Sequence, residues 1–269
     1  KIHWKSSVVN TNGYKKINFI KIMKLSDDGT AVVGKKIKEE CDCLGISGGW
    51  TPRVHLFTQS GGKLKFRDKD NVFLPDKSEL DQISVGSCNG DFELDEVIKN
   101  SVNSTNKFLK VNNNDYKNLE IISSKEIDKK NIWLLPSDKP LGKTKPFLDF
   151  QNDSTANDVK LALREGFKSI EHVKRYTTTG MATDQGKLSN MHALGIIAET
   201  AGVKMGELGT TTFRPPYTPL TFGAIVGRNV GEFFDITRKT PMHDWHVENK
   251  AEFENVGQWK RAWYYPKNN

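Results

Sequence analysis

Short apolar runs separated by polar turns fill the beginning of the chain. β-branched residues dominate these runs, and Gly, Asn and Asp bound them, a pattern typical of strands. The runs are Val8-Val9, Ile17 to Met23, Ala31 to Val33 and Cys43 to Ser47, with a turn at Asp27-Asp28-Gly29. They predict a β-meander that leads into a last buried strand.

After Pro146 the apolar spacing becomes that of amphipathic helices. Thr155 and Asp158 resemble a capping pair for a helix from about 156 to 165. Ser169 is expected to cap a second helix that runs through Arg175, and a third spans 190–201 and ends at Gly202. Three small helices after a β-rich region predict an α+β chain that contains a compact helical unit.

Two other segments lack helical or strand periodicity. Between Asn100 and Asp138 the composition turns to Asn, Ser, Lys and Asp, which indicates a linker or a loosely packed surface excursion. Arg214-Pro215-Pro216-Tyr217-Thr218-Pro219 is expected to run extended, because proline disfavours helix at itself and at its predecessor. We expect this arm to pack across a neighbouring domain.

Composition narrows the protein class. The 269 residues are 36% hydrophobic, yet the sequence lacks the run of roughly 20 apolar residues that a membrane helix needs. The formal charge of +7 comes from lysines mixed with acidic residues, which favours a solvated surface over a nucleic-acid site. A cytoplasmic protein without a membrane or nucleic-acid partner fits best. The start without Met suggests a fragment.

Three cysteines give no metal signal. Cys41 and Cys43 lack the second cysteine pair or nearby histidines of a zinc site, and Cys88 stands apart. We interpret all three as reduced, partly buried thiols and expect no metal site.

Two glycine-rich turns follow predicted strands. Gly48 and Gly49 end the run that begins at Cys43, while Gly86 and Gly90 follow Ile83-Ser84-Val85 and precede a predicted helix through Leu94 and Ile98. Glycines permit the backbone to approach a ligand or adopt positive φ. Together the turns resemble the closing elements of flavoproteins with two dinucleotide-binding domains. Ordinary strand-ending turns remain an alternative, and the chain lacks the Gly-x-Gly-x-x-Gly of a complete dinucleotide site.

A cationic, hydroxyl-rich segment precedes the third helix. It contains Lys174, Arg175, a run of threonines, two glycines and Lys187. Helix N-termini attract anions through their free amides and dipole, so the segment suits a phosphate. Solvated lysines and threonine turns would give the same composition.

At this point the sequence resembles the α subunit of heterotetrameric sarcosine oxidase. The resemblance lies in Asp149-Phe150-Gln151-Asn152-Asp153, His172 to Thr178, Gly180 to Lys187, Thr210 to Pro219 and Thr240 to Trp245. It implies an internal part of that subunit, in which residues 1–105 end an FAD/NAD(P)-binding-like domain. Residues 106–145 would be the linker, residues 146–239 a helical bacterioferredoxin-like domain with its arm, and residues 240–269 the start of an aminomethyltransferase-like folate-binding domain.

The helical unit also resembles the small ferredoxin-like domain that binds a [2Fe-2S] cluster in related two-component dehydrogenases. The positions that match its cysteines are Asp149, Gln151, Asp184 and Ser189. Such clusters need thiolate ligands, so we expect no iron–sulfur cluster.

The resemblance implies the cofactors and partners of the whole enzyme. These are FAD in the β subunit, FMN near the α/β contact, NAD in the α subunit, tetrahydrofolate at the folate domain, and β, γ and δ subunits. Sarcosine would be oxidised with electrons passing to oxygen, and this chain would supply no catalytic residue. We expect Arg175, Thr178, Gln185 and Lys187 to help hold FMN, and the isolated chain to be inactive.

The sequence is also compatible with other functions. Carboxylates and imidazoles at Asp149, Asp153, His172 and Asp184 could suggest a metal or hydrolytic site, as could His243 and His246, although packing roles are favoured. The chain could instead be a non-catalytic scaffold or interaction module whose arm docks a partner. A related N-methyl amino acid dehydrogenase is the remaining alternative.

Overall fold

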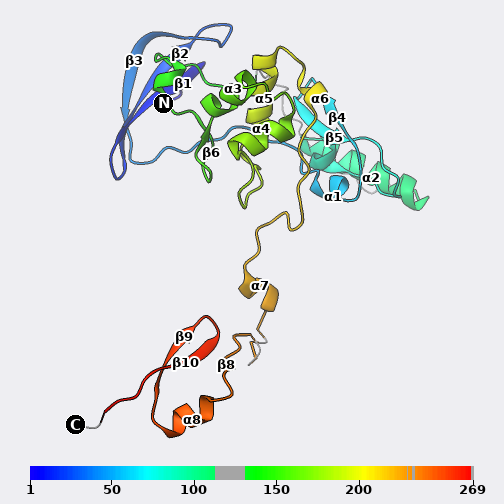
Figure 1. Cartoon of the computed structure of the whole chain (residues 1–269). Coiled ribbons are helices and arrows are strands. Elements are labelled where there is room, and N and C mark those ends of the chain that lie inside the picture. The colour runs from blue at the N-terminus through cyan, green and yellow to red at the C-terminus, as the bar shows by residue number, and fades with distance from the viewer. Residues whose placement is uncertain (113–130, 229, 232–233, 268–269) are drawn as a thin grey trace. The chain divides into compact units, whose positions relative to one another are not determined.

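The structure is a computed structural model that describes residues 1–112, 131–228, 230–231 and 234–267. The chain divides into two compact units, residues 1–218 and residues 219–269 (Figure 1). Both helices and strands occur, so the predicted α+β class is confirmed. No described helix is long and apolar enough to cross a membrane.

The first unit begins with an antiparallel meander of β1 (Ser6–Gly13), β2 (Ile17–Leu25) and β3 (Val32–Glu40), in the order β1-β2-β3. The predicted meander is therefore confirmed, with longer strands than the apolar runs indicated. Its buried apolar positions, Ile20, Ile22 and Met23, all lie on the central strand. Ile20 and Ile22 are two positions apart and therefore point to the same side of the sheet, and Met23 lies at a register shift between β2 and β3. One side of the sheet is therefore apolar.

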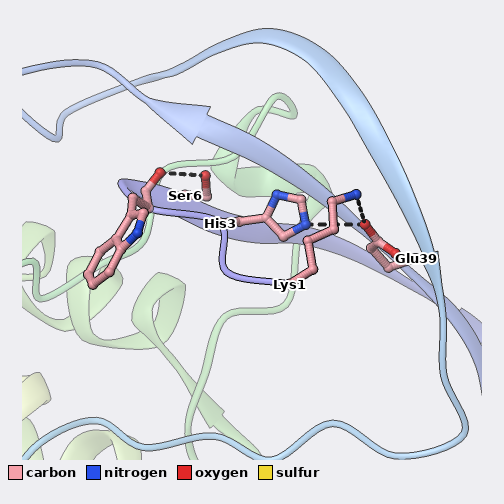
Figure 2. Close-up of polar contacts among 5 residues, drawn as sticks. Lys1, His3, Ser6 and Glu39 are labelled. Atoms are coloured by element: carbon pink, nitrogen blue, oxygen red, sulfur yellow. Dashed lines mark hydrogen bonds and ion pairs between the residues drawn. The ribbon is translucent and has the colours of Figure 1, made fainter.

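The residues before β1 reach across to β3. In Figure 2 the side chains of Lys1 and His3 converge on Glu39, with Nζ and Nε2 lying 2.9 and 3.1 Å from the same carboxylate oxygen. The hydrogen bond with Lys1 lowers the pKa of Glu39 most, and the hydrogen bond with His3 is the next largest cause. The carboxyl is solvent-accessible, so this contact orients the segment and adds little stability.

The predicted strand from Cys43 to Ser47 is wrong. Residues 41–54 have no regular secondary structure, and the side chain of Ile46 is 82% exposed. A strand needs a neighbour for its backbone groups, and none of the described strands pairs with this segment. Cys43 is accordingly exposed, whereas Cys41 and Cys88 are partly buried as predicted.

A small hairpin and three helical segments follow. The elements are α1 (His55–Gln59), β4 (Leu64–Arg67), β5 (Val72–Pro75), the 3-10 helix η1 (Gly86–Asn89) and α2 (Leu94–Leu109). Val72, Phe73 and Leu74 of β5 are buried, which anchors the hairpin. The predicted strand Ile83 to Val85 is wrong: these residues have no regular secondary structure and lead into η1.

The predicted helix through Leu94 and Ile98 is confirmed as α2, and it extends into the segment expected to be a linker. Asp95 and Glu96 in its first turn and Lys107 in its last complement the helix dipole. Polar side chains are compatible with a helix whose residues all remain at least partly exposed. Residues 113–130 of the expected linker lie outside the described residues.

The helical unit is built as the spacing predicted. Its elements are η3 (Leu141–Lys143), β6 (Phe147–Asp149), β7 (Ser154–Thr155), α3 (Ala156–Arg164), α4 (Ile170–Thr177), α5 (Asn190–Ala201) and α6 (Met205–Leu208). Thr155 and Asp158 form a reciprocal capping box, whereas Ser169 occupies the cap position of α4 without a side-chain capping bond.

The core of this unit lies around α5. Ile196 and Ile197 are essentially fully buried and pack with Val159 of α3 and Val173 of α4. Burying each such side chain stabilises the fold by roughly 1.5–3 kcal/mol. Trp133 packs against the same cluster, so the described end of the expected linker belongs to the core.

The second unit contains α7 (Phe222–Val226), β8 (Arg238–Lys239), α8 (His243–Glu248), β9 (Glu252–Val256) and β10 (Trp259–Tyr264). β10 pairs antiparallel with β9 and parallel with β8. His243 lies 4.8 Å from the Phe253 ring, and His246 hydrogen bonds with Tyr265. Both histidines thus have packing partners within this unit.

Candidate functional site

The loop between α4 and α5, residues 178–189, is held by the buried carboxylate of Asp149. This side chain is only 3% exposed. One oxygen accepts hydrogen bonds from the backbone N–H groups of Gln151 and Asn152, at 2.9 and 3.1 Å. The other accepts from the N–H of Gly180 at 2.7 Å. Asp149 therefore joins the turn after β6 to the start of the loop.

Threonine hydroxyls end α4 and begin the loop. Thr177 is buried, and its hydroxyl donates to the carbonyl of Val173 at 2.8 Å and lies 2.9 Å from that of Thr179. Thr178 adopts a left-handed backbone with φ of 59°. Its hydroxyl donates to the carbonyl of Thr177 at 2.7 Å. The left-handed Thr178 ends the helix, and the hydroxyl bonds help hold the turn that follows it.

The positions matched to cluster cysteines converge on this loop. The Gln151 side-chain oxygen accepts from the Asp184 N–H at 3.3 Å and from the Thr183 hydroxyl at 3.4 Å. The Asp184 carboxylate accepts from the N–H of Gly186 at 3.1 Å. Ser189 is buried, and its hydroxyl has no hydrogen-bond partner in the described part of the chain. Hydrogen bonds accepted by the side chains of Asp149, Gln151 and Asp184 hold the loop.

Two glycines allow the loop to close over Asn190. Gly180 and Gly186 have φ of 70° and 74°, a region that L residues with side chains rarely adopt. A Cβ at either position would lie within 2.3 Å of the Asn190 side-chain oxygen. The Asn190 amide donates to the carbonyl of Gln185 at 3.0 Å, so this asparagine is itself fixed.

The extended arm predicted after the third helix lies against this loop. The Gln185 amide donates to the carbonyls of Arg214 and Pro216, at 2.8 and 3.1 Å, and its oxygen accepts from the Arg214 N–H at 2.7 Å. Gln59 of α1 donates to the carbonyl of Phe213 at 3.0 Å. The Pro215–Pro216 peptide bond is cis. The arm is thus clamped between α1 and the loop.

Tyr217 is the centre of this contact. Its ring stacks on His55 with centroids 3.7 Å apart and an interplanar angle of 8°. The Lys187 ammonium lies 4.1 Å from the ring centroid, within the range of a cation–π contact. Phe213 meets the ring edge at 5.1 Å. Three residues from α1, the loop and the arm therefore meet at this one aromatic ring.

The surroundings of the arm are cationic. Burial, followed by the charges of Arg53 and Lys187, lowers the pKa of His55. Burial also lowers the pKa of Lys174; the charge of Arg214 adds to this lowering, while Glu171 opposes it. Lost solvent is the largest cause of both shifts, and neighbouring positive charge adds to it. Positive charge therefore gathers beside the arm.

The structure brings some predicted site residues together and separates others. Gln185 and Lys187 meet at the arm. The Arg175 guanidinium hydrogen bonds to the Glu171 carboxylate at 2.6 Å, and the Arg175 side chain remains 57% exposed. Thr178 is the residue at which α4 ends. Among the described residues, no group of three His, Cys, Asp or Glu side chains could hold a metal ion.

The glycine turns lie in two different environments. A Cβ on Gly48 would come within 2.9 Å of His192 on α5, so this turn lies against the helical unit. Gly49 and Gly86 have positive φ. The carbonyl of Gly90 accepts a hydrogen bond from Arg67 at 2.7 Å, and Gly90 packs against Leu74 of the hairpin.

The sequence did not predict a site role for His55, because the residues around it form no recognisable motif.

The histidines predict a pH dependence. Burial lowers the pKa of His55 and His192 from the ordinary value of 6.5, so the unfolded state binds protons more readily than the folded state. The contribution of these histidines to the free energy of unfolding is complete above pH 6.5. It is lost as the pH falls through their pKa values in the folded state. Urea denaturation at several pH values should show this loss, and it should be smaller in His55→Gln/His192→Gln. An equal loss in the variant would contradict the assignment.

Comparison with known proteins identifies relatives along nearly the whole chain. The family model described as the sarcosine oxidase A3 domain matches residues 143–228, which contain the loop and the arm. The chain is 38% identical to sarcosine oxidase subunit alpha of Corynebacterium sp. (strain P-1), over 97% of this chain and 28% of that protein. It is 34% identical to the subunit of the same name from Rhizobium meliloti (strain 1021), over 97% of this chain and 26% of that protein.

A solved structure shows a similar fold. L-Proline dehydrogenase from P. horikoshii matches with a TM-score of 0.52 and 17% identity, covering 81% of this chain and 44% of that one. The chain spans little more than a quarter of the length of the two subunits named above. The resemblance seen in the sequence is confirmed: this chain is homologous to sarcosine oxidase α subunits over nearly its whole length.

Proposed function

We propose that this chain forms part of the α subunit of a flavin-dependent sarcosine oxidase. In that enzyme sarcosine is oxidatively demethylated, electrons pass to oxygen, and the one-carbon unit passes to tetrahydrofolate. The homology over nearly the whole chain carries the proposal. The cationic loop and arm within the A3 match support a role in binding a cofactor or a neighbouring subunit.

We propose the same domain boundaries that the sequence predicted. Residues 1–105 close a dinucleotide-binding domain, residues 106–145 connect it to a helical domain at 146–239, and residues 240–269 begin a folate-binding domain. We further propose that the helical domain is ferredoxin-like and has lost its cluster. Hydrogen bonds at Asp149, Gln151 and Asp184 support this, because amide and carboxylate groups bind a loop there instead of iron.

FMN is the cofactor that we propose for this region, at the contact with the β subunit. Lys187 and Arg175 would supply positive charge for its phosphate, and Thr178 and Gln185 would supply polar groups nearby. FMN would accept and pass on electrons. The residues of this chain bind and orient; none is proposed to be catalytic. FAD in the β subunit, NAD in the missing part of the α subunit, and the γ and δ subunits complete the proposed assembly.

Flavin content of the assembled enzyme tests this role. We expect a complex of the chain with β, γ and δ subunits to absorb at about 450 nm, as oxidised flavins do. Lys187→Ala should lower the FMN released per complex, because it removes a cation from the proposed phosphate contact. Lys168→Ala is the matched control, since Lys168 is exposed on the same unit. Unchanged FMN in the Lys187 variant would contradict the assignment.

A scaffold function is the second candidate, and Gln185 favours it. Both the nitrogen and the oxygen of its side-chain amide hold the arm, which is what a docking module requires. A scaffold predicts a stable complex with the partner subunits whose flavin content is unaffected by any substitution around the arm.

A further inference from the structure

A separate groove lies in the first unit, between β1 and residues 134–146. Its volume is about 640 Å³, within the range of about 300–1,000 Å³ that is usual for ligand sites. Leu134, Leu135 and Leu141 give it an apolar wall. It shares no lining residue with the loop or the arm, so the proposed flavin role does not account for it.

One wall of the groove follows the edge of a sheet. Val8, Val9, Asn10 and Thr11 of β1 all line it. Successive side chains of a strand point to opposite faces, so a surface that touches four in succession runs along the strand edge. β1 is an outer strand of its sheet, and a bulge at Val9 interrupts its register with β2. Among the described residues, no strand other than β2 pairs with β1.

The lining of the groove is positively charged. Lys139, Lys143, Lys145 and Lys160 line the groove, and no acidic residue does. None of these lysines has an ion pair within the described part of the chain. Lysines often protect an edge strand from aggregation, but they then lie on that strand. Here the strand residues that line the groove are uncharged, and its lysines come from residues 139–145 and from α3.

We propose that this groove binds an extended acidic peptide segment of a partner polypeptide, which adds to the outer edge of β1. The free backbone groups of β1 would hydrogen bond to the peptide. Alternate peptide side chains would reach the lysines as carboxylates or the leucine wall as apolar groups. A small anion would use the lysines but would leave the strand edge and the apolar wall unexplained.

Fluorescence anisotropy tests the proposal with a labelled peptide of alternating Glu and Val, about eight residues long to match an ordinary strand. We expect saturable binding to the 269-residue chain, weakened at least about tenfold by Lys143→Glu/Lys145→Glu through charge repulsion. Lys99→Glu/Lys107→Glu on α2 changes the charge equally and should leave the affinity within about twofold, because exposed charges at a distance are screened. Circular dichroism and melting verify that both variants fold.

A second peptide separates strand addition from charge attraction. N-methylation of alternate backbone amides leaves the carboxylates unchanged but removes donors that a new strand needs, so affinity should fall at least about tenfold. Equal binding of the methylated peptide, or displacement of the Glu/Val peptide by low concentrations of inorganic tripolyphosphate, would show a general anion site and overturn the proposal. Absence of binding by the unmodified peptide would also overturn it.

Discussion

Asp149→Ala is expected to destabilise the first unit by about 2–4 kcal/mol. The substitution leaves the N–H groups of Gln151, Asn152 and Gly180 without their buried acceptor. An unsatisfied buried donor costs about 1–3 kcal/mol, although water entering the new space will offset part of the sum. Urea denaturation followed by circular dichroism measures the change, which should appear as a lower midpoint.

Two variants serve as controls for the Asp149 result. Asp149→Asn retains one acceptor oxygen and should lose less stability than Asp149→Ala. Asp81→Ala removes an exposed carboxylate and should change stability by less than about 0.5 kcal/mol. If all three variants unfolded at the wild-type midpoint, the carboxylate would not hold the loop.

Gly195→Ala is expected to destabilise the chain, although alanine favours a helix over glycine by about 1 kcal/mol. Gly195 lies inside α5, and its missing side chain lets the Trp133 indole pack against the helix. An added Cβ would lie 2.2 Å from the ring, so the ring or the helix must shift. Overpacking typically costs about 1–3 kcal/mol, which exceeds the gain in propensity. Thermal unfolding should show the loss.

A double-mutant cycle isolates the Trp133 contact. In a Trp133→Ala background the clash is absent, so Gly195→Ala should become neutral or stabilising. Gly142→Ala is the matched control, because nothing lies within 4 Å of the Cβ that it adds. A loss that persisted unchanged without the tryptophan would assign the effect to another contact of α5.

The local pattern was sufficient for the helical unit. Apolar positions at helical spacing predicted α3, α4 and α5, and Thr155 with Asp158 predicted the cap of α3. Consecutive prolines predicted an extended arm; the arm has neither helix nor strand, and it contains bends at Pro215, Tyr217 and Thr218. These features depend on residues within a few positions of one another, and backbone geometry acts over the same range.

Patterns that need a distant partner were less informative. An apolar run from Cys43 to Ser47 resembles a strand, yet no described strand pairs with it. Low apolar content from Asn100 onward indicated a linker, but α2 continues to Leu109, because exposed helices tolerate polar residues. Trp133 in the same region joins the core since α5 presents a glycine there.

The sequence by itself determined the α+β class, the three helices of the helical unit, an arm without helix and the homology to sarcosine oxidase α subunits. Only the tertiary structure decided that Gln185 holds the arm, that the Tyr217 ring contacts both His55 and Lys187, and that lysines line a groove along β1. Local preferences are set by neighbouring residues, whereas these contacts join segments far apart in the chain. They form only when the packed core fixes where each segment lies.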